Sequence, residues 1–209
     1  MKKLLSLVLA LLLALSFAGC SGSTAMTEKN VTATVDSAFD ALKRFDTKKL
    51  EKYVDSKTLS VIITYANKHD QFADLGKALF KNLEYNIDSI DLDAKTVTVS
   101  VRNKDLKDTA SAFTKALVSK YSALQMLGLL NNETWLNTSL KSLTDSIAIA
   151  KMQSAPVSVT LTVTAGKKNL MLGFDDAAEN AVSGGALQAV KSLTSGLTGS
   201  KSTTESTSN

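Results

Sequence analysis

The sequence contains few of the residues from which metal and catalytic sites are usually built. Its 209 residues include one cysteine, Cys20, and one histidine, His69. A zinc cluster of Cys and His ligands needs about four such residues, so this class of site is excluded. Without a second cysteine no intramolecular disulfide can form, and stability must come from a hydrophobic core. Hydrophobic residues make up 44% of the chain, which is enough to build one.

An excess of charge of one sign is also lacking. The chain has 24 basic and 20 acidic residues, a formal net charge of +4, and Lys2 and Lys3 supply half of that excess. The other basic residues are scattered along the sequence. Proteins that bind nucleic acid gather Lys and Arg on one face or in one stretch. We therefore predict that nucleic acid is not a partner.

The longest hydrophobic run lies at the start of the chain and is too short for a membrane span. Lys2 and Lys3 precede an almost unbroken apolar stretch at 4–14, and small residues follow as far as Gly19. This order of zones is that of a secretory signal peptide. A transmembrane helix needs about 20 apolar residues. We predict that residues 1–19 are an export signal that is removed.

The residue that follows this signal is the single cysteine, in the sequence Phe17-Ala18-Gly19-Cys20. These four residues resemble the lipobox of bacterial lipoproteins, Leu-(Ala/Ser)-(Gly/Ala)-Cys, with Phe17 in the place of Leu. The resemblance implies a diacylglyceryl cysteine at Cys20, cleavage before it, and often acylation of the new amino group, for example by palmitate. Two acyl chains are enough for stable membrane attachment. The implied location is the extracytoplasmic face of the cell membrane, within the cell envelope.

Composition divides the mature chain into three parts. The lipidated Cys20 and a short Ser/Gly tether, residues 20–26, lead into one domain at 27–193. The length of this domain suits a single core. The tail at 194–209 is mostly Ser, Thr and Gly, so it offers little to bury and we expect it to be disordered.

Apolar residues recur at helical spacing through much of the domain. Thr27 is the expected N-cap of a first helix. Asp46 restarts a helix whose apolar side includes Val54, and the polar stretch at 67–70 divides the next helical region in two. The longest stripe predicts one uninterrupted helix that begins after Asp105, with the inward residues Leu106, Ala110, Phe113, Leu117, Tyr121, Leu124 and Gly128.

This long helix is expected to cover the sheet, with Phe113 buried against Val97, Val99 and Val101. Asn131-Asn132 ends it and starts a second helix, which would pair with the first as an antiparallel hairpin.

Alternation at a period of two predicts two β-hairpins. The first joins 85–92 to 97–101, with a β-bulge near Asp88-Ser89 because the apolar residues before and after it fall on opposite parities. The second begins after Pro156 and joins 157–163 to 170–174.

The last helix is predicted from a short motif. Asp176 and Glu179 have the spacing of a capping box and would open a helix that runs through Val190. The pair Gly184-Gly185 would be a weak point inside it.

The order of elements predicts an α+β fold. We expect a four-stranded antiparallel sheet, made of the two hairpins, that packs against several helices and is covered on one face. Three stretches carry a further resemblance: Phe45-Asp46-Thr47-Lys48-Lys49-Leu50, Asn103-Lys104-Asp105-Leu106, and Leu172-Gly173-Phe174-Asp175-Asp176 with Asn180-Ala181 and Gly184-Gly185. They resemble uncharacterised lipoproteins of Gram-positive bacteria, usually placed near the cystatin-like and nuclear-transport-factor-two-like folds. The resemblance implies no functional residue.

No motif for chemistry stands out, and we predict no catalytic, cofactor-binding or metal site. The sequence has no Gly-x-Ser-x-Gly elbow, no Ser-x-x-Lys pair and no phosphate loop. Asp88, Asp91 and Asp93 form the nearest approach to an acidic cluster, but a calcium site needs more oxygen ligands and a glycine turn. We interpret this stretch as a solvated hairpin end and His69 as a surface residue. Core packing is the interpretation for Tyr53, Tyr65, Tyr85 and Tyr121.

Two functions remain. The favoured one is a non-catalytic binding or interaction module, held on the membrane by the lipid on Cys20, whose partner is a peptide, an envelope component or a small apolar ligand. The alternative is a small-molecule enzyme of the ketosteroid-isomerase type, with Asp88 as the base and Tyr85 as the oxyanion donor. An enclosed pocket with a buried carboxylate facing a tyrosine hydroxyl would favour the enzyme.

Overall fold

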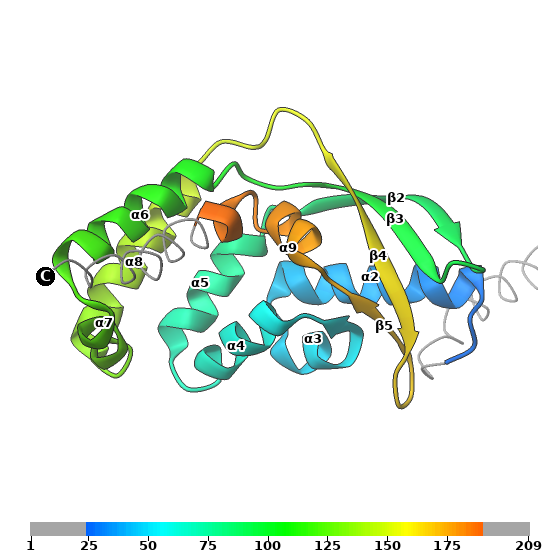
Figure 1. The fold of residues 1–209 in the computed structure, drawn as a ribbon, viewed down its shortest axis with the longest axis horizontal. Coiled ribbons are helices and arrows are strands. Elements are labelled where there is room, and N and C mark those ends of the chain that lie inside the picture. Colours follow the sequence, from blue (N-terminus) through cyan, green and yellow to red (C-terminus); the bar gives the residue numbers. More distant parts are fainter. Residues whose placement is uncertain (1–23, 190–209) are drawn as a thin grey trace, which may run out of the picture.

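The computed structural model describes residues 24–189 (Figure 1). The predicted export signal, Cys20 and the 194–209 tail lie outside these residues, and the predictions made for them stay predictions. The helices and strands follow one another as α2 (Glu28–Arg44), α3 (Thr47–Tyr53), β1 (Val54–Asp55), α4 (Lys57–Ala66), α5 (Asp70–Phe80), β2 (Glu84–Asp91), β3 (Thr96–Arg102), α6 (Lys107–Lys120), α7 (Ala123–Leu129), α8 (Glu133–Ile149), β4 (Val157–Ala165), β5 (Leu170–Gly173) and α9 (Asp176–Val182).

Within the described residues the sheet has five strands in the order β1-β5-β4-β3-β2. The α+β class is confirmed, and the strands of the two hairpins pair antiparallel as predicted. The prediction of four strands is wrong, because Val54 and Asp55 form a fifth strand parallel to β5. Two residues are too few to show an alternating pattern, so the helical period before them predicted Val54 as part of the preceding helix.

The sheet has one buried face and one polar face. Val97, Val99 and Val101 are fully buried, whereas the residues between them on β3 are half-buried. Strand β4 shows the same alternation. The predicted bulge is confirmed, since the register between β2 and β3 shifts between Ile87 and Ser89. The helices therefore cover one side of the sheet only, as expected.

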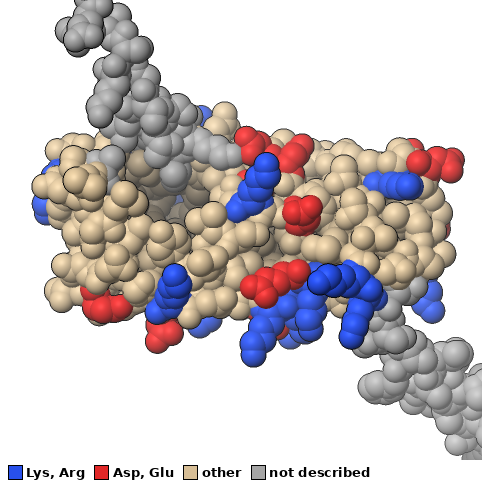
Figure 2. Space-filling model, turned by 60° about the horizontal axis from the view of Figure 1, so that its bottom comes forward, with Lys and Arg blue, Asp and Glu red and all other residues tan. Residues whose placement is uncertain are grey.

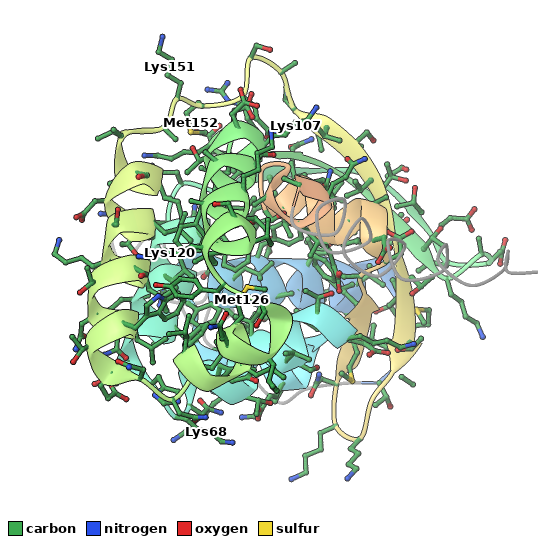
Figure 3. The ribbon with its side chains drawn as sticks, turned by 60° about the vertical axis from the view of Figure 1, so that its left-hand side comes forward. Lys68, Lys107, Lys120, Met126, Lys151 and Met152 are labelled. Carbon is green, nitrogen blue, oxygen red and sulfur yellow. The ribbon has the colours of Figure 1, made fainter. Side chains whose placement is uncertain are left out.

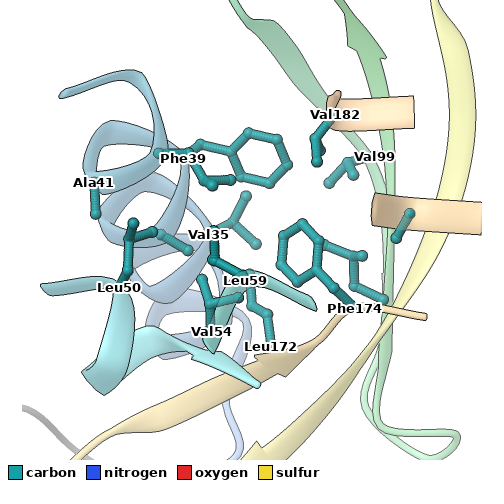
Figure 4. Close-up of a cluster of buried hydrophobic side chains, with 14 of the residues drawn as sticks. Val35, Phe39, Ala41, Leu50, Val54, Leu59, Val99, Leu172, Phe174 and Val182 are labelled. Carbon is teal, nitrogen blue, oxygen red and sulfur yellow. The ribbon is translucent and has the colours of Figure 1, made fainter. Parts of the chain in front are cut away.

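Helices α2 and α9 pack on the buried face of the sheet. Phe39 on α2 is fully buried at the centre of the core (Figure 4). Its ring stacks on that of Tyr85, with 4.4 Å between the centroids, and lies 6.2 Å from that of Phe174. This core is built from buried residues of 31–182, so a chain that begins at Ser21 retains all of it.

The predicted N-cap of the first helix is confirmed, and the second helix begins at Asp46 as expected. Thr27 Oγ1 accepts a hydrogen bond from the Asn30 N–H at 3.3 Å, and Asp46 Oδ1 accepts one from the Lys49 N–H at 3.1 Å. The polar stretch at 67–70 separates α4 from α5 as expected.

Helices α6, α7 and α8 form the end of the molecule farthest from the hairpins, at the left of Figure 1. The single long helix predicted there is wrong, because α6 ends at Lys120 and α7 begins at Ala123. Ser122 caps α7 by accepting from the Gln125 N–H, and the Gln125 side chain accepts from the Ser122 N–H. This capping box breaks the helix although the apolar period continues across it.

The packing of α6 also differs from expectation. It lies against α8, and the sheet is covered by α2 and α9 instead. Phe113 is therefore half-buried among helices, and the prediction that it is buried against Val97, Val99 and Val101 is wrong. The N-cap of α6 is Leu106, one residue after the predicted Asp105. None of the helices within 24–189 is long and apolar enough to cross a lipid bilayer.

The start of α9 corrects the predicted capping box. The N-cap is Asp175, whose Oδ1 accepts from the Ala178 N–H at 2.9 Å. Asp176 is the first residue of the helix, and the Glu179 side chain turns into the protein interior. The Asp176-x-x-Glu179 spacing is therefore not a capping box, because neither residue caps the helix.

The helix predicted through Val190 stops at Val182, and the chain turns at 183–185 before it is helical again at 186–189. Gly184 has φ of 61°, and a Cβ at this position would lie 1.8 Å from the Lys104 carbonyl oxygen. Its own carbonyl accepts from the Leu106 N–H at 2.8 Å. Only glycine fits this close approach. The helix therefore has to end before Gly184, where the sequence predicted only a weak point inside a continuous helix.

Candidate functional site

A pocket of about 510 Å³ lies among α4, α5, α6, α7, α8 and α9. Its volume is within the range of ~300–1,000 Å³ typical of small-molecule sites. Figure 3 views the molecule from the end where these helices gather, with Met126 of α7 labelled. A hollow is visible in the left-hand part of Figure 2, where uncharged side chains predominate. The space is therefore an opening among helices, and its inner wall borders the sheet core at residues such as Phe80 and Phe174.

The pocket walls are apolar, and the pocket is open because several large side chains in them are only half-buried. Helix α6 buries only Ala110 and Thr114, and the half-buried Phe113 and Leu117 face the opening. Trp135 of α8 is also half-buried and lines the space. The apolar stripe of α6, which predicted packing on the sheet, thus faces a hollow instead.

One carboxyl group lies in this apolar wall. Glu179 is 8% exposed, and its Oε1 accepts a short hydrogen bond from the Ser56 hydroxyl and a second one from the Thr58 N–H at 3.4 Å. Ser56 is in turn fixed as the N-cap of α4, where its hydroxyl oxygen accepts from the Leu59 N–H at 3.0 Å. Glu179 Oε2 is buried and has no hydrogen-bond partner. An unpaired buried acceptor is costly and needs an explanation.

The rim of the pocket includes the short helix α7. Met126 lines the space, whereas Leu124 and Leu127 on the same helix are 80% and 61% exposed. Helix α7 has no charged residue, and none of its residues from Leu124 to Leu129 is buried. It is therefore held mainly by its capping box and by contacts along the rim.

The pair predicted for an isomerase does not come together. Tyr85 faces the covered side of the sheet, where its hydroxyl donates to Asp36 Oδ1 at 2.8 Å. Burial of the ring raises the pKa of the Tyr85 hydroxyl, and the Asp36 carboxylate raises it further. Asp88 accepts hydrogen bonds from Ser100 and Asn86, which lower its pKa. The Ser100 partner places Asp88 on the polar face, opposite Tyr85.

The remaining candidates have structural roles. The His69 side chain is 13% exposed, less than expected for a surface residue, and its Nδ1 lies 2.9 Å from Glu133 Oε1. This contact, together with one from Gln71, lowers the pKa of Glu133. Asp91 Oδ1 accepts from the Ala94 N–H in the hairpin turn. Within 24–189 no three His, Cys, Asp or Glu side chains are grouped closely enough to hold a metal ion.

The sequence did not reveal Glu179 as a pocket residue, because its spacing from Asp176 was interpreted as a capping box at the start of the helix. A usable signal existed, since Glu179 lies three residues before Val182 and one after Ala178, both apolar and both buried. A charged residue on the apolar face of a helix is either paired or functional.

No known protein family, characterised protein or solved structure matches this chain at a significant level. The function must therefore be argued from the site itself.

Proposed function

We propose that this protein is a membrane-anchored, extracytoplasmic lipoprotein that binds an apolar ligand in the pocket among α4–α9. The observation that carries the binding role is the apolar opening of about 510 Å³, with Phe113, Leu117 and Trp135 in its walls. Apolar surface left against water forgoes about 25 cal/mol per Å² of transfer free energy. A ligand that covers this surface recovers that free energy.

The binding role is tested with a neutral fluorescent apolar probe, N-phenyl-1-naphthylamine, added to the chain that begins at Ser21. We expect saturable binding with one site per chain. Ala110 lines the pocket, so Ala110→Phe fills part of it and should weaken binding at least tenfold. Ala112→Phe on the exposed side of the same helix is the matched control and should leave binding unchanged. Equal affinities for the two folded variants would refute the pocket as the binding site.

The membrane anchor is supported by the resemblance of Phe17-Ala18-Gly19-Cys20 to a lipobox and by the signal-like segment before it. We expect Cys20→Ser to abolish incorporation of a labelled fatty-acid analogue and to release the protein from the membrane fraction. Because the core is built from buried residues of 31–182, the variant should still fold. Equal membrane association of the variant and the parent would contradict the anchor.

A second candidate, a small-molecule enzyme, gains support from one observation. Glu179 is a carboxyl group in an apolar pocket, the surroundings in which such groups act as bases in isomerases. The binding role is favoured because no tyrosine is among the described residues that line this pocket, and Asp88 and Tyr85 lie elsewhere. Exchange of the α-protons of an apolar ketone in D₂O tests the alternative. Acceleration by the parent chain and its loss in Glu179→Gln would establish the enzyme.

A further inference from the structure

The unpaired oxygen of Glu179 indicates what the ligand carries besides its apolar body. Three buried side-chain atoms within 24–189 lack a hydrogen-bond partner, on Gln71, Arg102 and Glu179, and only Glu179 belongs to the pocket. We propose that the ligand is an amphiphile whose protonated amine pairs with Glu179 Oε2 while its apolar body fills the space among the helices. This proposal rests on the binding role proposed above.

Contacts on the other oxygen fix the orientation of this carboxylate. The Ser56 hydroxyl and the Thr58 N–H both donate to Glu179 Oε1, and both belong to the start of α4. Rotation of the carboxylate to bring Oε2 to these donors would leave Oε1 unpaired instead. The protein therefore has donors for one oxygen and leaves the second for another molecule.

The hydroxyl groups of Thr114 and Ser183, which line the pocket, do not supply the missing donor. The Thr114 hydroxyl donates to the Ala110 carbonyl at 2.8 Å, and the Ser183 hydroxyl donates to the Asn180 carbonyl at 3.1 Å. Backbone carbonyls in the adjacent helices thus already use these protons. No described residue donates to Oε2, which leaves this oxygen for a donor on a molecule in the pocket.

Charge selects a cation over a neutral donor. Among the described residues that line the pocket, Glu179 is the one ionisable side chain, and none is Lys, Arg or His. Glu179 also takes part in none of the ion pairs found in the described part of the chain. A carboxylate in apolar surroundings is costly unless it is paired, so a cationic donor stabilises it more than an alcohol does. An anionic amphiphile such as a fatty acid would be repelled.

The test compares three probes of equal chain length: dodecylamine and dodecanoate, each below its micelle concentration, and 1-dodecanol below its solubility limit. Each is titrated against the chain that begins at Ser21 with N-phenyl-1-naphthylamine bound, and its displacement of that probe is measured. We expect dodecylamine to bind at least tenfold more tightly than 1-dodecanol, and dodecanoate to bind most weakly. Equal displacement by dodecylamine and 1-dodecanol would overturn the proposal without any variant.

Glu179→Gln then assigns the preference to one side chain. The substitution keeps the shape and removes the charge, so the tenfold preference for dodecylamine should vanish while the affinity for N-phenyl-1-naphthylamine stays within twofold. Glu51→Gln, an exposed glutamate on α3, is the control and should retain the preference. A folded Glu179→Gln protein that still prefers the amine contradicts the proposal. If the variant does not fold, the comparison of probes on the parent chain decides alone.

If the pocket binds no ligand at all, the result differs from that of a ligand without an amine. In that case N-phenyl-1-naphthylamine itself does not bind, and no displacement can be seen. If a chain that ends at Ala189 binds the probe although the parent does not, the occupant of the pocket is the chain's own C-terminal segment. That result would overturn both the proposal that the pocket binds a separate ligand and the proposal that this ligand carries an amine.

Discussion

The two ends of this molecule differ in how completely their apolar side chains are buried. In the sheet region, formed by β1–β5 with α2 and α9, the apolar residues Phe39, Val99 and Leu172 are fully buried. In the helical region, formed by α4–α8, the comparable residues Phe113 and Leu117 are half-buried around a pocket. In the sequence, both regions have regularly spaced apolar residues. The difference teaches that an apolar stripe specifies a buried or a ligand-binding face equally well, and that only packing separates the two.

The largest expected effect contrasts one phenylalanine from each region. Phe39→Ala removes a fully buried ring that stacks on Tyr85, and truncation of such a residue typically costs ~3–5 kcal/mol. Phe113→Ala should cost clearly less, because its ring already borders an open space. The free energy of unfolding, measured by denaturant titration, gives both values. Equal losses would show that the two regions are packed alike and would remove the contrast.

Ligand binding should sharpen the same contrast. At a probe concentration of 100 times the dissociation constant, binding to the native state alone contributes about 2.7 kcal/mol to stability. Local openings should be suppressed chiefly where the ligand makes contact. We therefore expect hydrogen exchange to slow in α6 and α7 when N-phenyl-1-naphthylamine is added, with little change in β3. Equal protection of α6 and β3 would mean that the probe stabilises the fold only globally.

A smaller effect is expected at the break between α6 and α7. Ser122→Ala removes the hydroxyl that caps α7, and loss of an N-cap typically costs ~1 kcal/mol. The exposed Leu124 and Leu127 offer little burial to compensate, so the change should loosen the pocket rim and weaken probe binding. Ser119→Ala, near the end of α6, is the control. Unchanged exchange rates in α7 would show that its rim contacts hold it without the cap.

Sequence patterns predicted the sheet region much better than the helical region. Strict alternation in β3 fixed both the strand and its buried face, and the change of parity near Asp88 located the bulge. These features depend on neighbours a few residues apart, so the local pattern contains them. Val54 and Asp55 escaped because a two-residue strand has no pattern of its own.

The helical region was less predictable because its arrangement depends on distant contacts. The stripe through Phe113 correctly indicated a helix, but the choice between the sheet and α8 as its partner is not local. Glu179 shows the same limit, because its partner Ser56 is 123 positions away in sequence. The capping box at Ser122 was readable, since Ser-x-x-Gln is a local signal, and the continuous apolar period masked it.

The smallest effects concern two exposed carboxylates, one in each region, and they appear in the pH dependence of stability. Hydrogen bonds from His69 and Gln71 lower the pKa of Glu133 from 4.5, and those from Ser100 and Asn86 lower the pKa of Asp88 from 3.8. A carboxyl group whose pKa is lower in the folded state stabilises the protein above its unfolded pKa. That contribution is lost as the pH falls through the folded pKa.

The two contributions should therefore fade in order as the solution is acidified. Glu133→Gln and Asp88→Asn should each lower the melting temperature slightly at pH 7, since both remove a charged acceptor. The difference between parent and variant should begin to close below pH 4.5 for Glu133 and nearer pH 3.8 for Asp88. Glu133 joins α8 to the start of α5, so its loss should also speed hydrogen exchange in α5. If the Glu133→Gln difference persists unchanged at pH 3, the hydrogen bonds to its charged form do not link α5 and α8, and the helical region is held by apolar contacts alone.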